Sequence, residues 1–270
     1  MSDARSESAD DQYIRLQLTA ANICHPEKTN CAGEDAYAIR DYGDRQLFAV
    51  ADGVSGSRKF GDPAEFSRSL LLYTLHNLEL GMAIPTAVAA AVDHARGKGK
   101  KGSTTFLIGL LDSNPHECSR CSVKLYNLGD SIAMLFRAHN NERYKVLAQT
   151  LPQSETRGYF HTPFQFHHDC DHSRGVSDMQ SYDWTLEPGD VLVAGTDGLF
   201  DFLDVEKVIA SIERYRDNFE NLADHLAKQA RCAQRCEYHF DDISVVVAVA
   251  QSSEKGGSPG LAIDNFGSVS

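Results

Sequence analysis

Short apolar runs of strand length alternate with turn-rich segments along most of this chain. Runs of this length, bounded by glycine, aspartate and asparagine, are typical of β-strands. The predicted strands cover residues 47–51, 104–111, 123–128, 132–137, 144–148, 185–186, 191–196 and 243–250.

Helical signals stand between groups of these strands. Asp62, Pro63 and Glu65 supply an N-cap, a proline at the first helical position and an acidic N3 residue, which predicts a helix from residue 62 to about residue 80. A second helix should begin at Pro85. Two later helices are expected at residues 205–214 and 219–232.

This order of elements favours an α+β fold. Helix pairs between runs of strands, without strict βα alternation, predict a four-layer α-β-β-α sandwich of two antiparallel sheets flanked by helix pairs. The 270 residues, 42% of them apolar, suffice for one large core. We expect one domain at residues 12–251, a flexible acidic tail at 1–11 and a second flexible tail at 252–270.

Acidic residues gather where predicted strands begin or end. Two apolar runs end abruptly in an Asp-Gly pair, and two other segments carry consecutive acids: Asp52-Gly53, Asp197-Gly198, Glu34-Asp35 and Asp241-Asp242. An isolated Asp-Gly pair usually marks an ordinary turn. Carboxylates brought together repel one another and lose hydration unless a cation lies between them, so the combination predicts a site for Mg²⁺ or Mn²⁺.

The charge balance excludes several partners. Lysine and arginine number 26 against 38 acidic residues, a formal net charge of -12, which disfavours binding to nucleic acid or to an anionic membrane. No apolar run approaches the roughly 18 to 20 residues that span a bilayer. Residues 1–11 resemble neither a signal peptide nor a transit peptide, so we expect a cytoplasmic protein.

Cysteine and histidine clusters offer an alternative metal site. The seven cysteines are scattered, which fits a reducing compartment, although Cys118-x-x-Cys121 and Cys232-x3-Cys236 could meet around zinc. Residues 167–172 also contain zinc-binding residue types, but they lack the i, i+4 helical spacing that presents two imidazoles on one face. We interpret residues 167–172 as part of a substrate-facing flap.

Six motifs follow one another along the chain. They are Gly33-Glu34-Asp35, Ala51-Asp52-Gly53, Gly102-Ser103-Thr104-Thr105, Asn127-Leu128-Gly129-Asp130-Ser131, the segment from Thr196 to Asp201, and Asp241-Asp242-Ile243-Ser244. In this order, over roughly residues 20–250, the series resembles the metal-dependent, type 2C serine/threonine protein phosphatases (the PPM family). Residues 50–54, 61–63, 66–67 and 158–165 look most like the small branch that includes the mitochondrial, T-cell-activation-type phosphatases. This branch implies a mitochondrial location as the alternative to the cytoplasmic one.

The resemblance implies roles for individual residues. Asp52 resembles the carboxylate that bridges two divalent ions, Mn²⁺ or Mg²⁺. Glu34 and the carbonyl of Gly53 would hold one ion, and Asp197 and Asp241 the other. Asp35 resembles an acid that hydrogen-bonds water on the metal, and Asp130 matches a position that helps bind a weaker third ion in some relatives. The implied reaction is attack on phosphoserine or phosphothreonine of a phosphoprotein by a water that bridges the two metals.

The physics of such a site supports this reaction. Two ions about 4 Å apart lower the pKa of a shared water and neutralise the phosphoryl oxygens, so neither a cysteine nor a serine nucleophile is needed. Coordination by carboxylates and waters predicts weak, chelator-sensitive binding.

Two positions depart from the family pattern. Val54 stands where many relatives have a histidine thought to act as general acid, and Asn30 stands where an arginine often binds the substrate phosphate. Arg58 and Lys59 are the candidate substitutes, because a guanidinium can clamp a phosphate with two hydrogen bonds. The alternative is that Arg58 and Lys59 form a solvated loop pair.

Two other functions stay open at this point. A pseudophosphatase would bind phosphoproteins without turnover, but it has no reason to keep Glu34, Asp52, Asp197 and Asp241 together. A two-metal nuclease is disfavoured by the acidic composition and by the lack of interleaved basic and aromatic residues. We expect a monomer whose partner is its phosphoprotein substrate.

Overall fold

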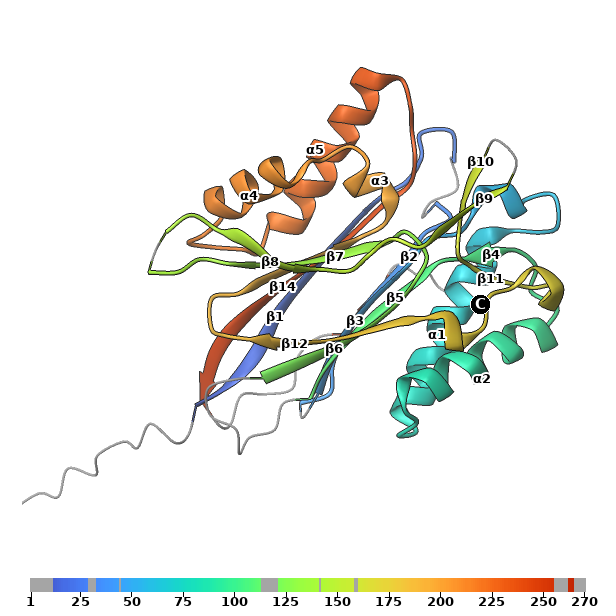
Figure 1. Cartoon of the computed structure of the whole chain (residues 1–270), viewed down its shortest axis with the longest axis horizontal. Coiled ribbons are helices and arrows are strands. Elements are labelled where there is room, and N and C mark those ends of the chain that lie inside the picture. Colours follow the sequence, from blue (N-terminus) through green and yellow to red (C-terminus); the bar gives the residue numbers. More distant parts are fainter. Residues whose placement is uncertain are drawn as a thin grey trace, which may run out of the picture.

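Two antiparallel sheets pack face to face at the centre of the computed structural model, and helices cover the outer face of each (Figure 1). The structure describes residues 12–28, 33–43, 45–112, 121–140, 142–157, 160–254 and 262–264. The predicted α+β sandwich of two antiparallel sheets flanked by helices is confirmed.

The first sheet has six strands in the order β12-β6-β5-β3-β2-β15. In that order the strands are Gln180–Leu186, Cys121–Leu128, Phe106–Asp112, Arg45–Ala51, Ala36–Asp41 and Ala262–Asp264. The second sheet has five strands in the order β1-β14-β13-β7-β8. They are Gln12–Ile23, Ile243–Glu254, Val191–Gly195, Ile132–Arg137 and Lys145–Gln149.

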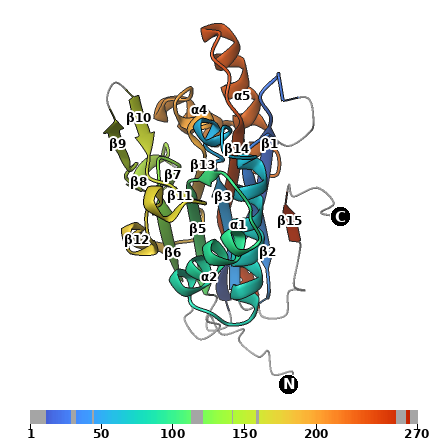
Figure 2. The same cartoon turned by 90° about the vertical axis from the view of Figure 1, so that its right-hand side faces the viewer.

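Helices α1 (Pro63–Glu79) and α2 (Ile84–Gly97) pack on the six-stranded sheet. The predicted start of α1 is confirmed, because the Asp62 side chain accepts the Ala64 N–H at 3.0 Å. The second helix pair, α4 (Val205–Arg214) and α5 (Leu222–Glu237), packs on the five-stranded sheet together with the short α3 (Asp197–Phe200). In Figure 2, which is turned by 90° from Figure 1, α1 and α2 lie in front of the strands of the sheets.

The start of α5 differs from the prediction. The helix begins at Leu222 rather than at Phe219. Asn218 Oδ1 accepts the Glu220 N–H at 2.9 Å, and this local turn occupies the residues where the helix was expected to begin. The helix then continues to Glu237, beyond the expected end at residue 232.

Each interface between layers has its own apolar core. Phe66 and Leu70 lie between α1 and the first sheet, and Ile212 and Leu226 lie between the second helix pair and its sheet. Phe48, fully buried, lies between the two sheets. Because burying such side chains is the main favourable term in folding, these three cores fix the strand ends relative to one another.

Small elements gather near one end of the sheets. They are β4 (Ser103–Thr104), β9 (Ser154–Arg157), β10 (Phe160–Pro163), β11 (Phe166–His167) and the short 3-10 helices Ser55–Ser57, Cys170–His172 and Val176–Asp178. The predicted strand 104–111 is therefore divided at Thr105. Thr104 leaves the sheet to pair with Phe166 of β11 and to bridge Gly53, which accounts for the break.

The sequence analysis missed β1, whose pairing with β14 is long-range, and β2, which forms a local hairpin with β3. β14 continues past the expected domain end at residue 251, to Glu254 opposite Gln12. Residues 262–264, expected in the second tail, form β15 against β2. The rest of the predicted tails, at 1–11, 255–261 and 265–270, lies outside the described residues, as do Asn30, Cys118 and Gly158.

None of the helices in the described ranges combines the length and the apolar character that a membrane crossing needs.

The packing of Phe48 on Gly109 generates a stability prediction. The two residues lie directly opposite each other in β3 and β5, and a Cβ on Gly109 would lie 2.3 Å from the Phe48 ring. Because the ring is fully buried and cannot move aside, Gly109→Ala should lower the free energy of unfolding by about 1–3 kcal/mol. Urea unfolding measures this change.

Gly97→Ala is the matched control, because a Cβ at Gly97 meets no atom within 4 Å. This control should leave the free energy of unfolding the same or raise it by up to about 1 kcal/mol. Equal losses in both variants would contradict the packing that we describe.

Candidate metal centre

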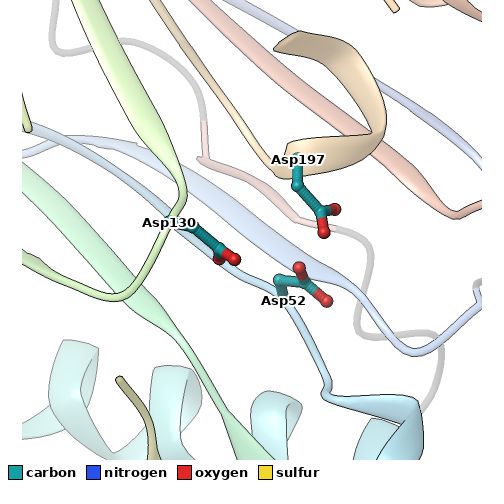
Figure 3. A group of neighbouring side chains, drawn as sticks. All are labelled: Asp52, Asp130 and Asp197. Atoms are coloured by element: carbon teal, nitrogen blue, oxygen red, sulfur yellow. The ribbon is translucent and has the colours of Figure 1, made fainter. Parts of the chain in front are cut away.

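Three aspartates from separate parts of the chain meet at one end of the sandwich. Asp52 follows β3, Asp197 is the first residue of α3 after β13, and Asp130 lies in the turn between β6 and β7. A carboxylate oxygen from each lies within 4.8 Å of the others, and Figure 3 shows the three side chains facing a shared space. The structure therefore brings together Asp52, Asp130 and Asp197, as the sequence predicts.

The glycines after two of these aspartates allow the acidic segments to approach closely. A Cβ on Gly53 would lie 2.5 Å from the Glu34 carbonyl oxygen, and one on Gly198 would lie 1.9 Å from the Asp242 carbonyl oxygen. Only a residue without a side chain fits at either contact. The Asp-Gly pairs therefore fix the spacing between neighbouring acidic segments as well as turning the chain.

Hydrogen bonds from two of the six motifs, Gly102–Thr105 and Asn127–Ser131, hold Asp52 and Asp130 in place. The Asp52 carbonyl accepts hydrogen bonds from Thr104 Oγ1 at 2.8 Å and from the Thr105 N–H at 2.9 Å. Thr105 Oγ1 in turn lies 3.1 Å from the Ser131 hydroxyl, next to Asp130. The two motifs thus join the strand end that carries Asp52 to the turn that carries Asp130.

Asp35 is fully buried behind the three aspartates. Thr196 Oγ1 donates to Asp35 Oδ2 at 2.9 Å, which connects Asp35 to the residue before Asp197. Burial raises the pKa of Asp35 well above its usual range, and the charges of Asp242, Asp241 and Asp197 raise it further.

The pKa values of Asp52, Asp197 and Asp130 are raised as well. Burial raises the pKa of Asp52 well above its usual range, with repulsion from Asp197 as the next cause. Burial, followed by repulsion from Asp241, raises the pKa of Asp197 to about 8. Burial also raises the pKa of Asp130 to about 6. Without a cation, these carboxyl groups hold their protons more tightly than ordinary aspartates do.

Asp241 lies beside this group but is not one of the three clustered carboxylates. Helix α5 holds its backbone: the Asp241 carbonyl accepts from Arg231 Nη2 at 2.9 Å, and its N–H donates to Gln234 Oε1 at 3.2 Å. The Asp241 side chain accepts the Asp242 N–H at 2.8 Å. Its charge still contributes to the raised pKa of Asp52 and Asp197.

Glu34, the other predicted ligand, faces basic residues instead of the aspartates. Its carboxylate accepts from Arg58 Nη2 at 2.9 Å and pairs with Lys28 Nζ at 2.7 Å, with further hydrogen bonds from Arg58 Nε and Ser55 Oγ. Burial alone would raise the pKa of Glu34, but these hydrogen bonds lower it below its usual range. Glu34 is therefore a stable carboxylate next to the group.

Asp242 anchors the segment that carries Glu34. Its buried carboxylate accepts the Glu34 N–H at 2.8 Å and the His25 N–H at 2.6 Å, and it also pairs with Lys28. Asp242 thus uses its charge to hold the chain before β2, whereas Asp241 beside it faces the acidic group.

Lys28 and Arg231 are residues of this site that the sequence reasoning missed. Lys28 pairs with both Glu34 and Asp242, and Arg231 also donates to the carbonyls of Ile23 and Cys24. No local pattern marks Lys28, because its partner Asp242 is distant in sequence.

Arg58 and Lys59, predicted as a pair, face different surroundings. Arg58 lies beside Glu34, whereas Lys59 lines a separate pocket with Phe60 and His167. Within the described part of the chain, residues 167–172 do not form a second metal-binding cluster.

The three aspartates fit a hard divalent cation. They offer only carboxylate oxygens, the ligands that Mg²⁺ and Mn²⁺ prefer. Asp130 Oδ1 is buried and has no hydrogen-bond partner among the described residues. A cation would satisfy that oxygen and would offset the repulsion that raises the pKa of each carboxyl group.

Comparison with known proteins places the chain in a family. The family model described as Stage II sporulation protein E (SpoIIE) matches residues 43–251. Probable protein phosphatase 2C 80 of Arabidopsis thaliana is 30% identical over 268 residues, which are 89% of this chain and 60% of that protein. Protein phosphatase PTC7 homolog of Xenopus laevis is 28% identical over 223 residues, which are 76% of this chain and 70% of that protein.

Solved structures agree with this placement. The X-ray structure of the photosystem II phosphatase PBCP superposes with a TM-score of 0.70 at 25% identity, covering 87% of this chain and 98% of that one. The catalytic domain of the serine threonine protein phosphatase PstP, solved with two manganese ions, shares the fold at a TM-score of 0.58 and 17% identity, covering 89% and 99%. The chain spans about three fifths of its Arabidopsis relative. It belongs to the SpoIIE family of protein phosphatase 2C-type, metal-dependent (PPM) phosphatases, within which it fits the PTC7-like branch.

Proposed function

We propose that this chain is a metal-dependent protein serine/threonine phosphatase that uses two Mn²⁺ or Mg²⁺ ions, with a weaker third. The observation that carries the proposal is the meeting of three half-buried carboxylates within 4.8 Å in a family of metal-dependent phosphatases. When bound, the ions supply a nucleophilic water and neutralise the phosphoryl oxygens. No cysteine or serine nucleophile is then needed.

The residues of this chain divide into ligands and positioning groups. Asp52, Asp197 and Asp241 would hold the catalytic ions, with Glu34 and the Gly53 carbonyl completing one site and Asp130 contributing to the weaker one. Asp35 would hold and orient water beside these ligands, through the carboxylate that Thr196 fixes.

Glu34 must exchange partners to act as a ligand. In this structure Arg58 and Lys28 neutralise its charge, so they compete with a cation for the same oxygens. Arg58 and Lys28 also line an open pocket of about 420 Å³ together with Asp241. We infer that Arg58 leaves Glu34 to clamp the substrate phosphate, because a guanidinium binds phosphate and carboxylate with the same fork of donors.

The substrate class follows from the family. A phosphoprotein bearing phosphoserine or phosphothreonine is the proposed partner, and the net charge of -12 argues against nucleic acid or anionic membranes. The monomeric state and the cytoplasmic location stay predictions. The pseudophosphatase alternative is disfavoured by the raised pKa of Asp52 and Asp197, because a protein that only binds phosphate gains nothing from buried, mutually repelling acids.

Removal of one carboxylate tests the proposed function. Asp52→Asn and Asp197→Asn should each lower kcat/KM by about 10³-fold, since each variant loses several kcal/mol of cation-dependent charge stabilisation. The assay follows hydrolysis of an aryl phosphate and of a phosphothreonine peptide with Mn²⁺, with Mg²⁺ and with chelator. Asp93→Asn is the control, because Asp93 is an exposed helix residue with an 80% exposed side chain. Mn²⁺ binding without turnover in the unaltered chain would favour the pseudophosphatase.

The raised pKa values predict how stability depends on pH without metal. A carboxyl group whose pKa rises from its ordinary 3.8 to about 8 on folding holds its proton more tightly in the folded state, so stability falls as the pH rises between these values. In chelator, the melting temperature should therefore fall from pH 5 to pH 8. Asp197→Asn should flatten this slope, and Mn²⁺ should raise the melting temperature most at pH 8. A pH-independent melting temperature in chelator would contradict the electrostatics described above.

Replacement of Arg58 should strengthen Mn²⁺ binding and raise the KM for the substrate. Arg58→Gln removes a cation that competes for Glu34, so Mn²⁺ binding should tighten about threefold, while the KM for a phosphothreonine peptide should rise about tenfold. Calorimetry and initial rates measure the two constants.

Arg143→Gln is the matched control for Arg58→Gln. Arg143 also pairs with a glutamate, and its side chain is 58% exposed against 53% for Arg58. The control should change neither constant. Weaker Mn²⁺ binding in Arg58→Gln would show that Arg58 supports the metal site instead of competing with it.

A further inference from the structure

A separate pocket of about 340 Å³ is lined by Val54, which stands two residues after Asp52 of the metal centre. One wall begins at Val54, the residue after the Asp52-Gly53 pair, and includes Ser57 and Lys59. The other wall comes from the segment of β10 and β11 and includes Thr162 and His167. The Val54 N–H donates to the Ser103 carbonyl at 3.0 Å, so the walls are tied to the strands that carry the acids.

Among the described residues, the lining of this pocket includes the cation Lys59 and no carboxylate. Lys59 has no acidic partner among the described residues, and its Nζ lies over the Phe60 ring, 4.8 Å from the centroid. Lys28 and Arg58, by contrast, are both paired with Glu34. His172, another residue of the lining, places its Nδ1 3.0 Å from Oδ2 of Asp169. Lys59 is therefore a cation available to a ligand, on a chain with a net charge of -12.

Ser103 and His167 add two polar groups to the lining of the pocket. Ser103 is fully buried, and its hydroxyl makes no hydrogen bond within the described residues. His167 is also buried, and its Nδ1 accepts the Asp169 N–H at 3.0 Å. Burial lowers the pKa of His167, which favours the neutral ring, and because Nδ1 accepts the Asp169 N–H, Nε2 is the nitrogen that can donate to a ligand. Lys59, Ser103 and His167 are thus three donors around one space.

The position of the pocket fits a substrate that is already held at the metal centre. Consecutive residues of an extended peptide advance by about 3.3 Å, so residues that flank the phosphorylated one reach the space beyond Val54. Donors without partners and a cation without a counter-ion favour an anionic group there.

We propose that this pocket binds a carboxylate or a phosphate on a substrate residue that flanks the phosphoserine or phosphothreonine. The inference rests on the proposed function, since it places the hydrolysed group among Asp52, Asp130 and Asp197. The pocket makes this chain selective for acidic or multiply phosphorylated sites. Lys59 supplies the charge, and Ser103 and His167 supply neutral donors.

Phosphothreonine peptides that differ only in their flanking residues test this proposal. Four peptides carry glutamate, a non-hydrolysable phosphonate analogue of phosphoserine, alanine or lysine on both sides of the phosphothreonine, which separates a carboxylate from a phosphate-like group as the preferred one. The unaltered chain should favour the glutamate or the phosphonate peptide over the alanine peptide about fivefold in kcat/KM. Lys59→Glu should reverse the order so that the lysine peptide is best, whereas a purely structural role of Lys59 would change all four equally.

Lys98→Glu is the control for the charge reversal, because Lys98 is exposed at the end of α2 and does not line the pocket. This variant should keep the preference of the unaltered chain. Fluorescence anisotropy of the same labelled peptides on the Asp197→Asn variant measures binding without turnover and should show the same order. Equal affinity for all four peptides, or a preference that Lys59→Glu leaves unchanged, would overturn the proposal. Hydrolysis of an aryl phosphate by the unaltered chain would still support the proposed function in that case.

Discussion

The repulsion between carboxylates held in one poorly hydrated space is the constraint on which this structure depends. Asp35, Asp52, Asp130, Asp197 and Asp241 come from separate segments, and charge repulsion would separate them in a flexible chain. The three apolar cores supply the opposing free energy, because they fix the strand ends that carry these side chains. The repulsion within the acidic group thus lowers the stability of the fold, and the packing of the sandwich offsets this loss. Bound cations would reduce the repulsion.

Basic residues around the site have distinct tasks. Lys28 and Arg58 neutralise Glu34 in the absence of a cation, and Lys28 also neutralises the buried Asp242. Arg231 satisfies backbone carbonyls at the junction of β1, α5 and the segment before β14. Lys59 has neither task, which is why its pocket is the one that we assign to an anion from the substrate. The same short loop therefore presents one cation to the metal centre and one to the neighbouring pocket.

Local sequence signals predicted the elements whose formation depends on neighbouring residues. The N-cap at Asp62 marked the start of α1, and the apolar runs marked β3, β7, β13 and β14, because burial on both faces leaves a continuous apolar segment. The strands that lack a continuous apolar run were missed, whether their partner is distant, as for β1, or local, as for β2 beside β3. β1 is a strand because it pairs along its whole length with β14, and Thr104 leaves β5 because β11 and Gly53 compete for it. The six motifs predicted which carboxylates would gather, but the capture of Glu34 by Lys28 and Arg58 depends on packing that spacing does not encode.

The central claim is that the clustered aspartates hold divalent cations. Anomalous diffraction from crystals grown with Mn²⁺ tests it most directly, because the signal locates the metal without reference to activity. We predict strong anomalous peaks among Asp52, Asp130, Asp197 and Asp241, with the Glu34 carboxylate turned away from Arg58. Crystals at neutral pH and millimolar Mn²⁺ with no peak between these carboxylates would contradict the account.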